Sequence, residues 1–209
     1  LFKIAFHYSE EGISFIEPEK VTVTTPTGAT FDGERINTAS VVAVSIIRAG
    51  DALLECFVNV APDAQVGKIL IQRNEETKQP QLFYSKLPSL ASKYVVLLDP
   101  MLATGGSAKA AIQVLLDNGA TEDRIMFLNV VSCPEGLQAI QSAYPAVQIV
   151  TGAVDAGLGY DISFLLVVAG VQDLEVLEAG LAQHVGEQFR LFDRGCANEN
   201  RLVALVGGL

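Results

Sequence analysis

Residues 95–107 read VVLLDPMLATGGS, an apolar run that ends in a carboxylate and continues into small and hydroxylated residues. Continuous apolar runs of this kind are typical of parallel strands that are buried on both faces. A helix is predicted to follow, and its first N–H groups, which lack intrahelical partners, can bind an anion. Gly105 and Gly106 carry no Cβ that would keep a phosphate away from these amides. Thr104 and Ser107 add hydroxyl donors, so the stretch predicts a phosphate cradle with an acid beside it.

A simpler interpretation of the same stretch is a strand-to-helix turn with Ser107 as a plain N-cap. The combination of Asp99, Thr104 and two glycines directly after an apolar strand favours a binding site instead. The lysine of the Walker loop is missing, so the motif does not predict ATP hydrolysis. Asp99 indicates a sugar hydroxyl or a metal ion as a further ligand.

Composition limits the classes to which the chain can belong. Its 209 residues are 50% hydrophobic and 18% charged, which excludes intrinsic disorder and predicts a globular protein. The net charge of -10 argues against nucleic acid as a partner, because phosphate backbones are bound by clustered cations. The longest apolar run, residues 164–171, is too short to span a membrane, so we expect a soluble, cytoplasmic protein without a membrane partner. The chain starts at Leu1 inside an amphipathic stretch, and we expect that a segment precedes it.

The rest of the chain alternates short apolar runs with helical periodicity, which is typical of an α/β fold. Strands are predicted at residues 41–47, 66–72, 81–86, 94–99, 125–132 and 147–154, and helices at residues 52–60, 107–117 and 134–143. We expect a mostly parallel sheet flanked by helices, with the polar stretch 73–93 as an excursion over the sheet edge. Residues 1–158 form this domain. Residues 159–209 form a divergent segment with a strand-like run at 162–169 and helical spacing at 174–181, and the pattern assigns it no fold.

Two arginines follow strands at the same predicted edge of the sheet. Arg48 comes after the strand at 41–47, and Arg73 comes after the strand at 66–72. Alone, an arginine after a strand is most often a solvated surface charge. Ligands of open α/β sheets bind at the carboxyl ends of the strands, so two arginines and the cradle at three such ends predict one anion-binding site.

Residues 98–107 resemble the phosphoribosyl-diphosphate loop of type I phosphoribosyltransferases. The Asp99-Pro100 pair stands where most members have two acids, and this form resembles the uracil phosphoribosyltransferases. Further stretches resemble that family's two basic loops, its hood and its later strands, in the order 44–50, 67–77, 83–88, 134–136 and 150–155. The resemblance covers roughly residues 15–158.

The resemblance implies a type I phosphoribosyltransferase fold with a β hood and the transfer of phosphoribosyl from phosphoribosyl diphosphate to uracil, giving UMP for pyrimidine salvage. It assigns phosphoribosyl-diphosphate binding to Arg48, Arg73, Asp99, Pro100, Met101, Leu102, Ala103, Thr104, Gly105, Gly106 and Ser107. It names no catalytic base. Mg²⁺ is expected to be carried mainly by the substrate phosphates, because this ion gives up its water ligands reluctantly. Residues 74–93 would be a cover that excludes water, or an ordinary surface hairpin.

The uracil-binding half of the family's pattern is not matched. Where the family has Val-Pro-Gly followed by Gly-Asp pairs after the position of Asp155, this chain has GLGYDISF at residues 157–164. The alternative therefore stays open that the chain is a catalytically impaired module that senses nucleotides or oligomerises. The resemblance also implies a homo-oligomer and GTP as an effector, although the family's N-terminal arm is short here.

Overall fold

The structure, a computed structural model, describes residues 2–74, 77, 79–155 and 202–204. Its helices are α1 (Phe2–Ser14), α2 (Asp51–Val60), α3 (Gly106–Asp117) and α4 (Pro134–Ala143), with short 3-10 turns at Thr38–Ser40 and Glu122–Arg124. Its strands are β1 (Glu19–Thr24), β2 (Thr30–Arg35), β3 (Val41–Ile47), β4 (Gln65–Arg73), β5 (Pro80–Lys86), β6 (Tyr94–Leu98), β7 (Met101–Leu102), β8 (Ile125–Ser132), β9 (Gln148–Val154) and β10 (Leu202–Ala204).

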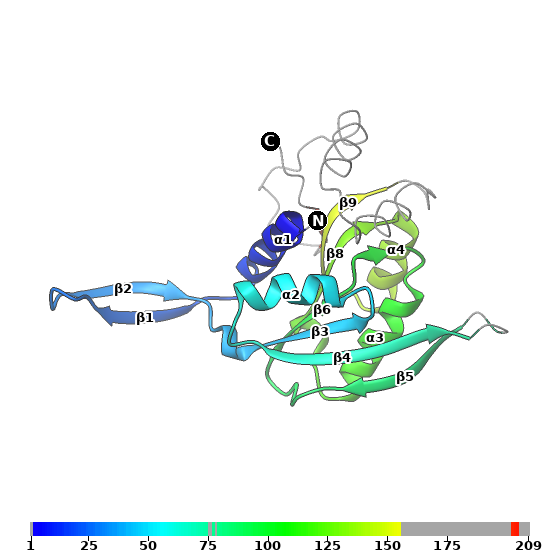
Figure 1. The fold of residues 1–209 in the computed structure, drawn as a ribbon, viewed down its shortest axis with the longest axis horizontal. Coiled ribbons are helices and arrows are strands. Elements are labelled where there is room, and N and C mark those ends of the chain that lie inside the picture. The colour runs from blue at the N-terminus through cyan, green and yellow to red at the C-terminus, as the bar shows by residue number, and fades with distance from the viewer. Residues whose placement is uncertain (1, 75–76, 78, 156–201, 205–209) are drawn as a thin grey trace.

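One mixed sheet forms the body of the protein (Figure 1). The strand order is β10-β9-β8-β6-β3-β4-β5, and the short β7 pairs with β8. Each of these pairs is parallel except β4 and β5, which are antiparallel. The predicted α/β fold with a mostly parallel sheet is confirmed. Because β3, β4, β6, β8 and β9 are parallel, their carboxyl ends all lie at the same end of the sheet.

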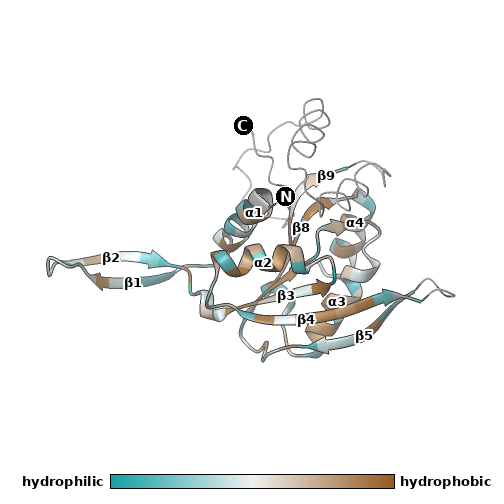
Figure 2. Cartoon of the chain, viewed as in Figure 1, coloured by the Kyte–Doolittle hydropathy of each residue, from teal (hydrophilic) through white to brown (hydrophobic). Residues whose placement is uncertain are grey.

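Helices cover both faces of the sheet, so the core has two halves. Leu53 and Phe57 of α2 pack with α1 on one face, and Ile112 of α3 packs with α4 on the other. The side chains of β3 lie alternately in the two halves of the core, because successive side chains of a strand point to opposite faces of the sheet. Figure 2 shows hydrophobic colour on β3 and β4 and on parts of the helices that cover the sheet. The apolar runs therefore mark strands that lie between two layers of helix.

The predicted strands and helices between residues 41 and 154 are present, with ends shifted by one residue or so. The stretch predicted as an excursion over the sheet edge is β5, a strand that joins that edge beside β4. Leu90, which follows β5, is 1% exposed and belongs to the core. The part of the stretch after β5 is thus anchored to the body.

The elements that were not predicted are α1, the hairpin of β1 and β2, the two-residue β7 and the three-residue β10. The hairpin of β1 and β2 extends away from the body, as Figure 1 shows, and Gly28 in its turn has φ +85°. The three-residue β10 pairs in parallel with β9 at the opposite edge from β5. The strand and helix suggested for residues 162–181 lie outside the described residues. Within the described part of the chain, no helix is long and apolar enough to cross a membrane.

Candidate functional site

The cradle predicted from the sequence lies where β7 passes into α3. Gly105 precedes the helix with φ +79°, a conformation that residues with a side chain rarely adopt, and its carbonyl accepts the Lys109 N–H at 2.8 Å. A Cβ added at Gly106 would meet only Thr104 Oγ1 at 3.9 Å and Pro80 Cγ at 4.0 Å. The space beside Gly106 is therefore open at the first turn of α3, where backbone amides can receive an anion.

The loop that leads into the cradle is fixed by main-chain hydrogen bonds to β8 and its end. The Pro100 carbonyl accepts the N–H groups of Val130 and Val131 at 3.0 and 3.1 Å, and the Leu102 carbonyl accepts that of Cys133 at 2.8 Å. The Leu102 side chain is 2% exposed and belongs to the core, so it supports the loop from below. Met101, Ala103, Thr104, Gly106 and Ser107 are half-buried. The loop is thus preorganised by its backbone.

Asp99 directly follows β6, and its N–H donates to the Leu128 carbonyl at 3.3 Å. The residue keeps some exposed surface, but its carboxyl group is largely enclosed by protein. Burial raises the pKa of the Asp99 carboxyl to about 7, against the opposing effect of a hydrogen bond from the Met101 backbone. The carboxyl group is thus divided between its two protonation states near neutral pH, and its ionised form can accept hydrogen bonds from sugar hydroxyls.

Arg48 lies exposed in the turn between β3 and α2, after a cis Ile47–Arg48 peptide bond. The Gly50 N–H donates to the Ile46 carbonyl at 2.9 Å. A Cβ added at Gly50 would overlap the Leu98 carbonyl oxygen, because the turn packs against the end of β6. The Arg48 turn therefore lies beside the strand end that carries Asp99.

Arg73 is the last residue of β4, and its backbone is paired with Pro80 of β5. Pro80 also lies at van der Waals distance from the open side of Gly106. The backbone of the β4 end is therefore next to the cradle. The predicted binding residues come together at the carboxyl ends of β3, β4 and β6, which is where ligands bind in open α/β sheets.

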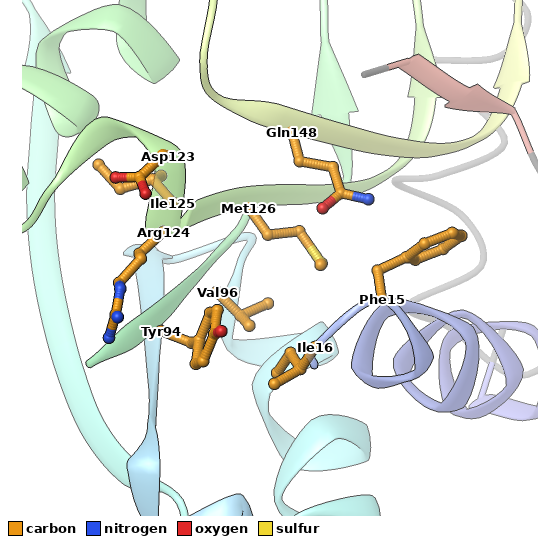
Figure 3. Close-up of a pocket in the computed structure, with 9 residues that line it drawn as sticks. All are labelled: Phe15, Ile16, Tyr94, Val96, Asp123, Arg124, Ile125, Met126 and Gln148. Atoms are coloured by element: carbon orange, nitrogen blue, oxygen red, sulfur yellow. The ribbon is translucent and has the colours of Figure 1, made fainter. Parts of the chain in front are cut away.

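A second hollow, of about 170 Å³, lies at the opposite end of the strands (Figure 3). It is lined by Phe15 and Ile16, which directly follow α1, and by residues at the beginnings of β6, β8 and β9. Arg124 at its rim lies 5.2 Å from the Tyr94 ring centroid and donates to the Ser92 carbonyl at 2.8 Å. Because this guanidinium is already held by protein groups, the hollow offers less for an anion than the cradle does.

Two groups of supporting residues were not predicted from the sequence. Gly136 of α4 lies so close to the Ala103 carbonyl that a Cβ there would overlap it. Ser45, Asp51 and Lys68 form a hydrogen-bonded cluster below the Arg48 turn. The only signal in the sequence was that Asp51 follows the Arg-Ala-Gly turn directly. Among the described residues there is no group of three His, Cys, Asp or Glu side chains that could hold a metal ion.

Three comparisons with known proteins identify sequences and structures that resemble this chain. A family model described as uracil phosphoribosyltransferase matches residues 2–181, which extends past residue 158. The uracil phosphoribosyltransferase of Dictyostelium discoideum is 44% identical over 150 residues, 71% of this chain and 69% of that protein. The solved structure of the AQ2163 protein from Aquifex aeolicus is 36% identical, with a TM-score of 0.68 over 75% of this chain and 74% of that chain. A purine phosphoribosyltransferase from Pyrococcus horikoshii shares the fold at 15% identity, with a TM-score of 0.51 over 74% of this chain and 82% of that chain.

Proposed function

Since this chain belongs to the uracil phosphoribosyltransferase family, we propose that it transfers the phosphoribosyl group of phosphoribosyl diphosphate to uracil in pyrimidine salvage. A nitrogen of uracil attacks the anomeric carbon of the sugar, the bond from that carbon to the diphosphate oxygen breaks, the proton carried by that nitrogen is released to the solvent, and UMP and diphosphate are formed. The observation that carries the proposal is the meeting of the Arg48 turn, the end of β4 and the open side of Gly106 at one sheet edge.

The proposed binding roles follow from the chemistry of each group. Arg48 and Arg73 would bind the diphosphate oxygens, because a planar guanidinium group matches their geometry. The backbone of residues 104–107 receives a phosphate at the start of α3, and ionised Asp99 accepts hydrogen bonds from the ribose hydroxyls. The phosphates are thus matched with positively charged or N–H groups, and the ribose hydroxyls with a hydrogen-bond acceptor.

Catalysis in this site rests on orientation and on stabilisation of the departing diphosphate. The sugar develops positive charge and the diphosphate negative charge as they separate, so groups that stabilise the diphosphate lower the activation barrier. Aligning uracil with the anomeric carbon lowers this barrier further. We assign no catalytic base. Of the two interpretations of residues 74–93, a cover that excludes water and a surface hairpin, the structure favours the hairpin, because β5 pairs with β4 and Leu90 lies in the core.

The donor set of the described residues fits a magnesium ion that arrives on the substrate. Asp99 is a single carboxyl group, and Asp51 is already held by Lys68. Mg²⁺ prefers oxygen ligands and keeps several waters, so the diphosphate would be its main ligand. When bound, the ion would neutralise charge on the leaving group.

Two measurements on one sample test the proposed function. Phosphoribosyl diphosphate with Mg²⁺ should raise the melting temperature, with about 2.7 kcal/mol of stabilisation at ~100 times the dissociation constant. Uracil should then be converted to UMP at a measurable rate. No thermal shift at millimolar ligand would refute the binding site. A shift without turnover would support the impaired sensing module, an alternative that the transferase relatives do not favour.

We also propose that the hairpin of β1 and β2 contributes to a homo-oligomer. Among the described residues its two strands pair only with each other. Val23 and Phe31 lie opposite one another and are 47% and 62% exposed. Burying this apolar pair against a second copy would remove it from water. Phe31→Asp should lower the oligomer mass in light scattering. Phe83→Asp, at a 57% exposed position on β5, is the matched control and should leave that mass unchanged.

GTP as an effector and a cytoplasmic location complete the proposal, and both rest on the resemblance and composition of the sequence. The first is tested by uracil turnover with and without GTP at subsaturating phosphoribosyl diphosphate. Equal rates would remove GTP from the proposal.

A further inference from the structure

Three polar side chains from three elements meet directly below the Arg48 turn. Ser45 of β3 donates its hydroxyl hydrogen bond to Asp51 Oδ1 at 2.6 Å. Lys68 Nζ of β4 donates to Oδ1 and Oδ2 of the same carboxylate, at 3.1 and 3.0 Å. Ser45 and Lys68 are register partners in the parallel pair of β3 and β4. These three residues, the Asp51 cluster, therefore tie the start of α2 to two neighbouring strands.

The Asp51 cluster controls the shape of the turn through the backbone of Asp51. Asp51 is the first residue of α2, and its N–H donates to the Arg48 carbonyl at 3.1 Å. On the other side, Gly50 packs against the end of β6. The turn of residues 48–50 is thus held between the end of one strand and an anchored carboxylate, which limits the positions that Arg48 can take.

The exposure of the Lys68–Asp51 ion pair indicates that the Asp51 cluster acts locally and not on the stability of the whole protein. The Lys68 and Asp51 side chains are 42% and 40% exposed, and an ion pair with that much solvent contributes little to global stability. The charges of Asp51 and Lys68 have a larger effect on the affinity for an anion bound nearby. An unpaired carboxylate three residues after Arg48 would repel a diphosphate, whereas the Lys68 ammonium offsets that charge.

The protonation of Asp51 is consistent with a firmly held pair. Burial acts to raise the pKa of its carboxyl group, but the hydrogen bonds from Ser45 and Lys68 and the Lys68 charge outweigh burial and leave the pKa below its ordinary value. Asp51 is therefore a carboxylate at neutral pH, and its charge has to be compensated.

We propose that Ser45, Asp51 and Lys68 are positioning residues that hold the Arg48 turn in its diphosphate-binding shape, and that Lys68 screens the site from the Asp51 charge. The inference rests on the proposed function of the site. It assigns Lys68 an effect through Asp51, without contact between Lys68 and the substrate.

A double-mutant cycle tests the screening. Lys68→Met should raise the KM for phosphoribosyl diphosphate about tenfold with a smaller change in kcat, because it leaves the Asp51 charge uncompensated. Asp51→Asn added to Lys68→Met should recover most of that loss, and Lys68→Arg should stay close to wild type. Lys86→Met removes the same charge from the register partner of Lys68 on β5 and should leave KM unchanged.

The outcomes separate this inference from the function on which it rests. Melting temperatures without ligand show whether each variant folds, and a merely structural cluster would lower them with no specific rise in KM. Wild-type KM in Lys68→Met would overturn the inference, and so would equal impairment of the single and double variants, which would place Lys68 on the substrate. If the wild-type protein neither binds phosphoribosyl diphosphate nor turns over uracil, the proposed function fails instead.

Discussion

Gly106 and Gly105 are neighbours with different structural requirements. Gly106→Val should abolish the thermal shift caused by phosphoribosyl diphosphate, because the branched side chain would fill the open space where a phosphate would bind. The nearest atoms to an added Cβ are 3.9 and 4.0 Å away, so the melting temperature without ligand should change little. Differential scanning fluorimetry with and without ligand measures both effects.

Gly105→Ala is the matched control for that experiment. Gly105 has φ +79°, so alanine there is strained and should lower the melting temperature in the absence of ligand, at a cost of about 1–2 kcal/mol. Normal binding by Gly106→Val would contradict the position assigned to the cradle.

The enclosed carboxyl group of Asp99 should make ligand affinity depend on pH. Its pKa is about 7, and sugar hydroxyls donate to the ionised form, so affinity for phosphoribosyl diphosphate should rise with pH. Between pH 6 and pH 8 the ionised fraction, and with it the affinity, increases about tenfold for a pKa near 7. Isothermal titration at several pH values measures this. Asp99→Asn is the control that isolates the effect from titration of the ligand phosphates, and an identical slope in that variant would contradict the assignment.

The same group affects folding stability with the opposite dependence on pH. Its folded pKa of about 7 lies above the ordinary value of 3.8, so between these two values the folded chain holds a proton that the unfolded chain has released. The contribution of Asp99 to the free energy of unfolding is therefore largest at low pH and falls as pH rises through about 7. Urea unfolding at several pH values gives the free energy of unfolding of the wild type and of Asp99→Asn. Over this window the free energy of the wild type should change more steeply with pH, and an equal change in both proteins would count against the raised pKa.

At the scale of elements, the packing of α4 determines where the cradle loop lies. Replacing a glycine inside a helix by alanine normally stabilises the protein. Gly136→Ala should instead destabilise the protein by about 1–3 kcal/mol, because the added Cβ overlaps the Ala103 carbonyl and lies 2.9 Å from Leu102 Cγ. Affinity for phosphoribosyl diphosphate should fall as well, since the loop would move. Chemical unfolding and titration measure the two effects, with exposed Gln138→Ala on the same helix as the control.

The strands that are buried between helices were the most clearly predictable elements. The strands β3, β6 and β8 are buried between helices, so their apolar runs are long and their limits are clear. The hairpin of β1 and β2 contacts no core over most of its length, and its strands are mainly exposed, so no buried face imposes a pattern on the sequence. The three residues of β10 are too few to show a period.

The candidate site divides in the same way. The cradle could be predicted because its glycines and hydroxyl residues are consecutive, and Arg48 and Arg73 because each follows an apolar run. The Asp51 cluster could not be predicted, since Ser45 and Lys68 become neighbours only through the register of β3 with β4. Contacts that depend on strand register are not visible in a local pattern.

At the scale of the whole molecule, the phosphosugar half and the base half of the reaction depend on different parts of the chain. Reading a pyrimidine requires donors and acceptors within hydrogen-bond distance of its edge, and a site without them discriminates poorly. After Asp155 the sequence supplies Phe164, Leu165 and Leu166 and no Gly-Asp pair of the kind the family uses. We therefore expect uracil turnover at least about 100-fold slower than in a family member that carries the motif, equivalent to about 2.7 kcal/mol in transition-state binding.

A chimera tests whether that deficit belongs to the C-terminal segment. Replacing residues 159–209 with a family tail that carries the Gly-Asp motif should restore uracil turnover and leave the thermal shift with phosphoribosyl diphosphate unchanged, because the proposed phosphosugar residues all lie before residue 108. The truncated chain 1–158 is the control, since it shows whether loss of the β10 pairing with β9 alone changes stability. Wild-type turnover equal to that of the relative would contradict the expected deficit. A chimera that binds phosphoribosyl diphosphate yet gains no turnover would place the fault outside the tail, in the first 158 residues.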